Sequence, residues 1–317
     1  MSSPSSLLEP SHHPCPELLD LIGETPLLRL DRIGLGLPPG VRLLAKAEHL
    51  NPSGSLKDRS AKAMILAAVA SGELRGARRI LDATSGNAGI AYAMVGAALG
   101  FGVTLCLPAN ATAERKTILR IRGAAIVETD PALGSDGAQA RARALLQEDP
   151  ERYVHLDQYN NDANWRAHYD GTGREIWAQT GGRVTHFVAG MGTSGLFMGT
   201  ARRLKALNPA ITALALQPDS RDHGLAGLKH LKTAAVPGIY DPSVADATWE
   251  VSTAEGWDMA RRLVLEEGLM TGPSSGANVA AALRLGRALP PGSVVVTVLF
   301  DSGTRYLGEP GWEKGWG

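Results

Sequence analysis

Short apolar runs typical of β-strands alternate with longer runs of helical periodicity along most of the chain. The predicted strands are residues 43–46, 79–83, 103–107, 125–128, 185–189, 211–217 and 293–300. The predicted helices include residues 60–71, 90–99, 113–122, 196–207, 254–267 and 277–289. Strands and helices that alternate in this way predict an α/β fold with mostly parallel sheets, covered by helices on both faces. Ligands of such sheets bind beyond the carboxyl ends of the strands, so the chemistry is expected in the turns there.

The charge balance and the cysteine content exclude several classes of function. The 32 basic side chains equal the 32 acidic ones, so no net positive field is available for nucleic acid or an anionic membrane. Two cysteines, Cys15 and Cys106, are too few for a disulfide framework. His12, His13 and Cys15 are bunched in a Ser- and Pro-rich tail without the features of a secretory signal, so we expect no metal site there. We therefore expect a cytoplasmic protein that binds small molecules.

Residues 83–113 contain no charged side chain, and hydropathy alone suggests a membrane span. Gly100 and Gly102 divide this segment, however, and the polar turn 84–87 precedes its helical part. The segment is therefore predicted to form a buried helix followed by a buried strand.

The segment NPSGSLKDR, residues 51–59, carries a lysine just before the predicted helix from Ser60. Because the helix dipole leaves positive charge at this end, a neutral amine or imine on Lys57 is easier to maintain than an ammonium group. That suits a lysine that bonds covalently to a carbonyl cofactor. A solvated lysine paired with Asp58 is the simpler alternative. A nucleotide-binding P-loop is excluded, because the glycine spacing and the Ser or Thr after the lysine are missing.

Three further turns place small polar side chains at the start of a helix. TSGNAG, residues 84–89, offers backbone amides to a carboxylate, although plain helix capping is an alternative. GMGTSG, residues 190–195, is equally placed for a phosphate. It also matches the GxGxxG pattern with Asp219 as the acidic partner, so an NAD-dependent oxidoreductase is the alternative from another class. GPSSGA, residues 272–277, either binds a ligand or caps the helix that follows.

Together and in this order, the four turns resemble those of the cysteine synthase (O-acetylserine sulfhydrylase) family of fold type II pyridoxal 5'-phosphate (PLP) enzymes, which includes cystathionine β-synthase. The similarity begins at IGETPL, residues 22–27, and continues through residues 158–177 to DSGTRY, residues 301–306. GLAGLKH, residues 224–230, resembles the B-type cysteine synthases.

The resemblance implies two αβα domains with mostly parallel sheets, similar to the tryptophan synthase β fold. A smaller mobile domain, residues 45–160, would carry the carboxylate-binding loop. A larger domain, residues 1–44 plus 161–317, would bind the cofactor phosphate. Relatives of this family are usually homodimers, so a homodimer is expected.

The resemblance also implies roles for single positions. Lys57 would bind the cofactor covalently and remove the substrate α-proton, and Asn87 would hydrogen-bond the phenolic oxygen of the ring. Ser274 would face the pyridine nitrogen, where a neutral hydroxyl in place of a carboxylate favours chemistry at the β-carbon. The cofactor phosphate would be bound by Gly192, Thr193, Ser194, Gly195 and Leu196. The substrate carboxylate would be bound by the loop and its partner, Thr84, Ser85, Gly86, Ala88 and Gln158.

The implied reaction is a β-replacement that makes L-cysteine from an O-activated serine and a sulfide source. The donor would be O-acetylserine or O-phosphoserine. Lys229 is a candidate contact for a phosphate leaving group, and a solvated lysine is the alternative. Condensation of serine with homocysteine, as in cystathionine β-synthase, is the nearest alternative reaction.

Overall fold

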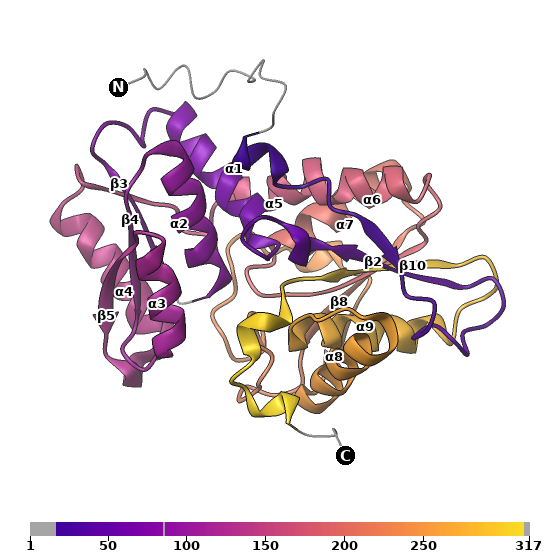
Figure 1. Ribbon diagram of the computed structural model, residues 1–317. Coiled ribbons are helices and arrows are strands. Elements are labelled where there is room, and N and C mark those ends of the chain that lie inside the picture. Colours follow the sequence, from indigo (N-terminus) through magenta and orange to yellow (C-terminus); the bar gives the residue numbers. More distant parts are fainter. Residues whose placement is uncertain (1–16, 85, 314–317) are drawn as a thin grey trace. The chain divides into compact units, whose positions relative to one another are not determined.

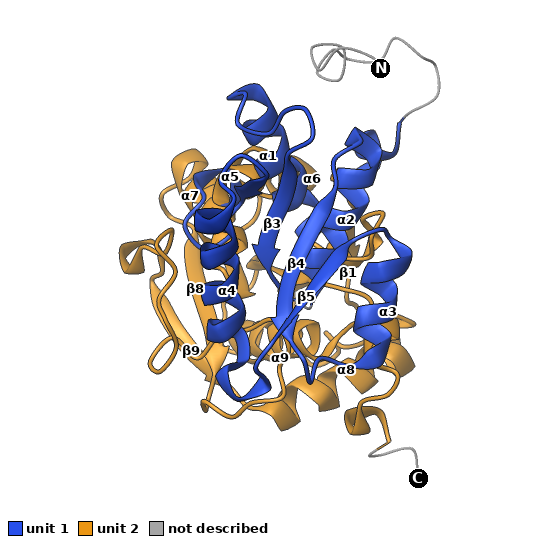
Figure 2. Ribbon diagram, turned by 90° about the vertical axis from the view of Figure 1, so that its left-hand side faces the viewer, with its two compact units in different colours: residues 1–22, 57–164 blue, residues 23–56, 165–317 orange. Residues whose placement is uncertain are grey.

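The computed structural model describes residues 17–84 and 86–313, and it divides the chain into two compact units (Figure 2). Unit 1 consists of the described residues within Met1–Ile22 and Lys57–Asn164. Unit 2 consists of those within Gly23–Leu56 and Trp165–Gly317. Both units are α/β, as the alternation of strands and helices predicts.

The boundaries of the units differ from the predicted domain ranges, 45–160 and 1–44 plus 161–317. Residues 45–47 belong to β2 (Arg42–Ala47), which pairs along its whole length with β10 (Val294–Leu299) of unit 2. The amide of Leu56 donates to the carbonyl of Phe300 at 2.9 Å, so the segment up to Leu56 stays with unit 2. The residues before Gly23 belong to unit 1 instead, where the carbonyl of Leu19 accepts a 2.8 Å hydrogen bond from Lys62 Nζ. Strand pairing therefore places residues 45–56 in the larger unit.

Unit 1 contains a sheet of four parallel strands in the order β5-β4-β3-β6 (Figure 1). Its strands are β3 (Arg79–Ala83), β4 (Val103–Pro108), β5 (Ala125–Thr129) and β6 (Tyr153–His155). Its helices are η2 (Leu18–Leu21), α1 (Lys57–Ala70), α2 (Asn87–Leu99), α3 (Ala113–Ile121), η4 (Pro131–Leu133) and α4 (Gly134–Glu148). The short helix α5 (Asp162–Ala167) runs across the boundary into unit 2.

Side chains that alternate along these strands give the sheet two apolar faces. Ile80 and Leu105 pack with α1, α2 and α3 on one face. Leu81 and Cys106 pack with α4 on the other. The uncharged segment 83–113 forms the buried helix α2 and the buried strand β4, which confirms that prediction. Nowhere in the described parts of the chain does a helix combine the length and the apolar character needed to cross a bilayer.

Unit 2 contains a six-stranded sheet in the order β1-β2-β10-β7-β8-β9, in which only the edge strand β1 is antiparallel to its neighbour. Its remaining strands are β1 (Leu27–Arg29), β7 (His186–Gly190), β8 (Thr212–Pro218) and β9 (Ala247–Val251). Its helices are η3 (Glu48–Leu50), η5 (His168–Gly173), α6 (Arg174–Gln179), α7 (Gly195–Leu207), η6 (Pro242–Val244), α8 (Thr253–Glu267), α9 (Pro273–Gly286), η7 (Gly303–Tyr306) and η8 (Pro310–Trp312).

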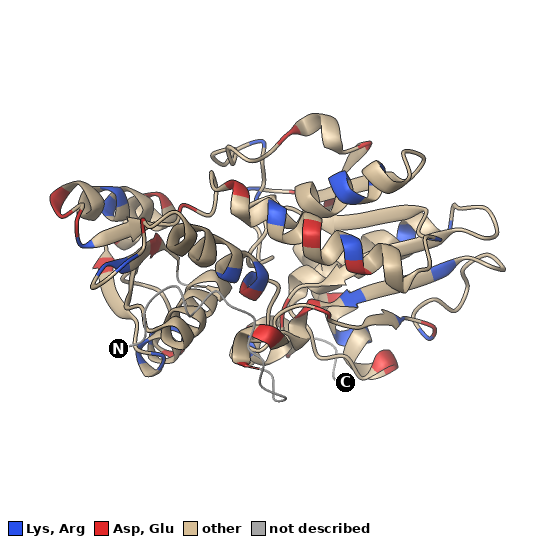
Figure 3. Ribbon diagram, turned by 90° about the horizontal axis from the view of Figure 1, so that it is seen from above, with Lys and Arg blue, Asp and Glu red and all other residues tan. Residues whose placement is uncertain are grey.

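Helices cover both faces of this sheet as well. Phe187 and Val296 pack with α6 and α7 on one face. Val188 and Val295 pack with α8 and α9 on the other. The central strands are buried on both sides, which explains why β10 is a continuous apolar run. Basic and acidic residues are interspersed along the ribbons of both units (Figure 3), in keeping with the balanced charge of the sequence.

Candidate functional site

The turn before Lys57 is held on one side by a buried carboxylate. Asn51 donates from Nδ2 to both the carbonyl and the Oε2 of Glu48, each at 2.9 Å. Thr25 donates from Oγ1 to Glu48 Oε1 at 2.8 Å. The amide of Gly23 donates to Asn51 Oδ1 at 2.9 Å, so the IGETPL motif and the NPSGS turn are parts of one hydrogen-bonded network.

A buried ion pair supports this network. Lys46 Nζ lies 2.6 Å from Glu175 Oε2, and both side chains are almost completely inaccessible to solvent. Lys46 also donates to Gln179 Oε1 at 2.9 Å and to the carbonyl of Thr25. The ammonium group therefore has a full set of acceptors, as a buried charge requires.

The C-terminal DSGTRY motif holds the same turn from the other side. Arg305 donates to the carbonyl of Ser53, and the amide of Ser302 donates to the carbonyl of Gly54 at 3.1 Å. Ser55 forms an isolated β-bridge with Asp301. Gly54 has a φ of 86°, and a Cβ there would lie 3.3 Å from the Arg305 guanidinium, so this position requires glycine.

Lys57 is the first residue of α1 and is half-buried. The helix therefore begins three residues before the predicted start at Ser60, and its first turn contains the candidate lysine. This location places the amine in the positive field of the helix dipole.

The predicted carboxylate loop follows β3 and leads into α2. Gly86 is the N-terminal cap of α2 and donates its amide to Thr84 Oγ1 at 3.2 Å. Asn87 and the buried Ala88 open the helix, where the first amides have no acceptor within the helix itself. Ser85 lies outside the described residues. The loop therefore ends in helix amides with a hydroxyl beside them, as predicted for an anion site.

Gln158 lies near this loop because of the strand order. It follows β6, and β6 pairs in parallel with β3, which ends immediately before Thr84. Gln158 is buried, and Asn164 donates to its carbonyl at 2.7 Å. Two predicted substrate residues from distant parts of the sequence thus follow neighbouring strands at the same edge of the sheet.

The predicted phosphate loop connects β7 to the thirteen-residue helix α7. Ser194 caps this helix with a φ of 71°, and its side chain makes no capping hydrogen bond. Its Oγ is buried and has no hydrogen-bond partner among the described residues. Successive amides, a left-handed residue and a helix N-terminus are the features of an anion-binding loop. A buried, unsatisfied hydroxyl in such a loop fits the phosphate group of PLP.

Gly192 packs closely against a neighbouring segment of the chain. A Cβ on Gly192 would overlap the carbonyl oxygen of Gly227. The amide of Lys229 donates to the carbonyl of Met191 at 2.8 Å, so the segment 227–229 packs directly on the loop. The Lys229 ammonium lies 3.3 Å from the carbonyl of Ala235. The backbone of Lys229 is therefore next to the predicted phosphate loop.

Ser274 is the second residue of α9 and is only 2% exposed. Sequence reasoning missed Asn278, one turn further along the same helix. Asn278 Oδ1 accepts from the amide of Gly190 at 2.8 Å, and Nδ2 donates to the carbonyl of Val298 at 2.8 Å. This buried amide joins the helix that carries Ser274 to the strand that precedes the phosphate loop. The signal in the sequence was a single Asn within the otherwise apolar stretch 277–283.

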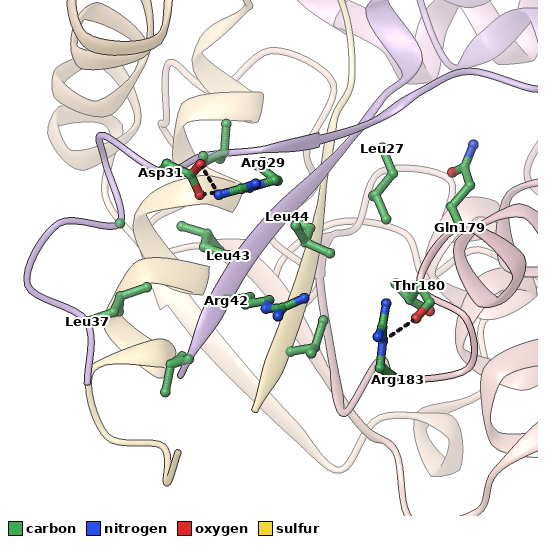
Figure 4. Close-up of a pocket in the computed structure, with 14 residues that line it drawn as sticks. Leu27, Arg29, Asp31, Leu37, Arg42, Leu43, Leu44, Gln179, Thr180 and Arg183 are labelled. Atoms are coloured by element: carbon green, nitrogen blue, oxygen red, sulfur yellow. Dashed lines mark hydrogen bonds and ion pairs between the residues drawn. The ribbon is translucent and has the colours of Figure 1, made fainter. Parts of the chain in front are cut away.

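Two other features lie apart from these loops. In unit 2, a cavity of about 420 Å³ is lined by Leu27, Arg42, Leu44, Arg183 and neighbouring residues (Figure 4), and none of the predicted site residues lines it. Within residues 17–84 and 86–313, no group of three His, Cys, Asp or Glu side chains is arranged to hold a metal ion.

Comparison with known proteins identifies the family. Residues 18–301 match the model of the pyridoxal-phosphate dependent enzymes. The chain is 48% identical to "Cysteine synthase" of Aquifex aeolicus (92% of this chain, 90% of the relative) and 43% identical to "Cysteine synthase B" of Pseudomonas aeruginosa (92% and 96%). Its structure resembles that of O-acetyl serine sulfhydrylase isoform 3 from Entamoeba histolytica with a TM-score of 0.90, at 32% identity over 98% of this chain and 95% of that one. The chain belongs to the cysteine synthase family of fold type II pyridoxal-phosphate dependent enzymes.

Proposed function

We propose that the chain makes L-cysteine by β-replacement from an O-activated serine, O-acetylserine or O-phosphoserine, and a sulfide source. The observation that carries this proposal is the extent of the match to named cysteine synthases, at 48% identity over 92% of the chain for the relative from Aquifex aeolicus. The local structure supports it, because the four motifs of the sequence all lie in turns or at helix N-termini.

The cofactor roles follow the fit of each residue to PLP. Lys57 Nζ would bind the cofactor covalently, Asn87 would hydrogen-bond its phenolic oxygen, and Ser274 would face its ring nitrogen. The amides of Gly192, Thr193, Gly195 and Leu196 would bind the phosphate together with the hydroxyl of Ser194, whose Oγ is unsatisfied. When bound, PLP stabilises the negative charge that develops at the α-carbon of an amino acid.

Ser274 bears on the type of reaction. A buried hydroxyl at the start of α9 is neutral, and it would hydrogen-bond a ring nitrogen without holding a proton on it. The side chain therefore supports moderate charge withdrawal, which is sufficient for loss of a β-substituent.

The remaining residues bind the substrate and move its proton. Thr84, Ser85, Gly86, Ala88 and Gln158 hold the α-carboxylate, with donors from the loop and from the start of α2. In its free amine form, Lys57 Nζ would remove the α-proton of the donor and return it to the product. We further infer that unit 1, which carries the carboxylate loop, is the mobile unit and that its movement excludes water during the reaction.

The alternatives from the sequence are less well supported. Residues 18–301 match a PLP family, which does not favour a dinucleotide at GMGTSG. Condensation of serine with homocysteine is not favoured either, because the two named relatives compared above are cysteine synthases. We also propose a cytoplasmic protein that binds neither nucleic acid nor membranes, on the basis of the balanced charge and the low cysteine content. A homodimer is proposed on the family resemblance alone.

Turnover with defined donors tests the function. The purified holoenzyme is mixed with sulfide and either O-acetylserine or O-phosphoserine, and in parallel with serine and homocysteine. We expect cysteine from at least one ester and little cystathionine. Formation of no cysteine from either ester, or faster formation of cystathionine, would contradict the proposal.

The role of Lys229 is tested in the same assay. If its ammonium binds a phosphate leaving group, Lys229→Ala lowers kcat/KM for O-phosphoserine and leaves the value for O-acetylserine unchanged. Lys232→Ala is the matched control, because Lys232 is a nearby exposed lysine paired with Glu250. Equal effects on both donors would remove Lys229 from donor recognition.

A further inference from the structure

Unit 1 contains a cluster of titratable side chains that the proposed chemistry does not use. Asp82 is the next-to-last residue of β3 and is 2% exposed. His155 is the last residue of β6, and Tyr92 lies within α2 and is fully buried. Polar groups are rare inside an apolar core unless they are hydrogen-bonded or have a functional role.

The geometry pairs two members of this cluster across neighbouring strands. His155 Nε2 lies 3.7 Å from Asp82 Oδ1, and both side chains are largely buried. Asp82 Oδ1 also accepts from the amide of Ala83 at 2.7 Å. The second oxygen, Oδ2, and the hydroxyl of Tyr92 are buried without hydrogen-bond partners among the described residues. The Asp82 carboxylate therefore lacks some of the hydrogen bonds that it could accept. Its electrostatic interaction with His155 is stronger than it would be at the surface, where water screens charges.

This pair lies where both candidate substrate segments begin. On the β3 side, Asp82 holds the amide of Ala83, and the next residue, Thr84, donates its amide to the carbonyl of Cys106 at 3.1 Å. On the β6 side, the residue after His155, Leu156, donates its amide to the carbonyl of Leu81 at 3.2 Å. Gln158 follows two residues later. The contact between Asp82 and His155 therefore adds a side-chain link, beside the backbone hydrogen bonds, between the two strand ends that lead to Thr84 and Gln158.

The charges around the pair favour a protonated imidazole. The pKa of His155 is raised overall. Burial and the charge of Arg143 lower it, but the Asp82 carboxylate and, more weakly, Asp157 raise it by more. Burial and then Asp82 raise the pKa of Tyr92 well above its usual range. The other titratable groups that act on the cluster are Cys106, on the adjacent strand β4, with Arg141 near it, and Tyr159, with Asp136 near it.

We propose that Asp82 and His155 are positioning residues that hold the Thr84 loop and Gln158 at the spacing the substrate carboxylate needs, and that they do so best when His155 is protonated. The imidazolium attracts the buried carboxylate with a full charge, and the neutral ring does not. Loss of this attraction relaxes the strand ends and weakens carboxylate binding. The inference rests on the proposed function, because it assigns both segments to the substrate carboxylate.

The test is the pH profile of KM for the preferred donor in the holoenzyme. His155→Gln keeps a donor near the position of Nε2 but cannot gain a charge. At about pH 6 we expect KM of His155→Gln to exceed that of the wild type by about three- to tenfold, with kcat within about twofold. At about pH 9 the ratio of the two KM values returns to near one. Taking the ratio at each pH cancels ionisation of the donor itself.

Two further variants keep the test decisive. Asp82→Asn preserves the shape of the side chain and removes its charge, so it should raise KM at acid pH in the same way as His155→Gln. His186→Gln is the matched control, because His186 is a half-buried histidine at the start of β7 in unit 2. It should leave the KM profile unchanged.

The outcomes separate the pair from the proposed function. If the wild type makes cysteine and the KM ratio is the same at all pH values, the pair has only a structural role and the inference is wrong. A kcat loss without a KM change is equally incompatible with it. If the wild type makes no cysteine from either ester, the proposed function fails and the inference fails with it.

Discussion

Replacing Gly192 with alanine should weaken cofactor binding without unfolding the protein. A Cβ at this position would overlap the carbonyl oxygen of Gly227 and lie 3.3 Å from its carbonyl carbon. Both are backbone atoms, which cannot move aside by a change of rotamer. The loop 192–195 must therefore shift away from the segment 227–229, and its amides shift with it.

The size of the effect follows from the hydrogen bonds that the phosphate accepts from this loop. A hydrogen bond to a charged group contributes about 1.5–3 kcal/mol. Loss of one such bond weakens PLP binding roughly ten- to hundredfold, since about 1.4 kcal/mol corresponds to a factor of ten. Loss of two such hydrogen bonds would weaken PLP binding by the product of the two factors.

The assay is titration of the apoenzyme with PLP, followed by visible absorbance. Gly308→Ala is the matched control, because a Cβ there meets no atom within 4 Å. We expect the dissociation constant of Gly192→Ala to rise by the factor above and that of Gly308→Ala to stay within about twofold. An unchanged dissociation constant for Gly192→Ala would refute the assignment of this loop to the phosphate.

Three other predictions concern the core of each unit. Glu175→Leu leaves Lys46 buried without its 2.6 Å partner and should lower the free energy of unfolding of unit 2 by about 3–5 kcal/mol in urea, followed by Trp fluorescence. Glu250→Gln, in an exposed pair, should lower it by less than about 1 kcal/mol, and equal losses would contradict this. Burial is the main cause that raises the pKa of Cys106 to about 11; the charge of Asp82 adds to this effect and that of Arg141 opposes it. At about pH 8 a thiol reagent should therefore label the Cys106 peptide only after unfolding. The pKa of His155 is raised in the folded protein, so the stability of the wild type relative to His155→Gln should be greatest at acid pH and should fall as the pH rises through that pKa. A stability difference that grows with pH would contradict this prediction.

The elements that the sequence predicted are those with a continuous apolar run. All the predicted strands are present with ends within one residue of the prediction. Most of them are central parallel strands, which are buried on both faces, whereas β5 is a predicted strand at a sheet edge. The missed strands β1, β6 and β9 all lie at sheet edges, where one side of the strand has no partner and short mixed sequences suffice. The helix α4 was missed because it buries only small side chains, Ala138 and Ala142, and its apolar periodicity is weak.

The candidate site shows the same division. The motifs around Lys57, Asn87, Ser194 and Ser274 could be found because each combines a turn with a helix start within a few residues. The contacts that hold these turns were not predicted, because the groups that make them are far apart in sequence. Asn278 contacts strands β7 and β10, and only the folded chain brings them together.

The compact units differ from the predicted domain ranges for a related reason. The range 45–160 assumed that the segment before Lys57 follows the lysine into the smaller domain. The residues up to Leu56 instead pair with β10 and with Phe300, which lie some 250 residues away along the chain. Local composition carries no information about such pairing.

The covalent attachment of PLP to Lys57 is the most direct test of the proposed chemistry. Purified holoenzyme is reduced with borohydride, digested and mapped by mass spectrometry, with Lys57→Ala treated in parallel. We expect the pyridoxyl mass on the peptide that contains Lys57 and its absence from the variant. A pyridoxyl group on another lysine, or none after incubation with excess PLP, would contradict the assignment of Lys57 as the cofactor-binding residue.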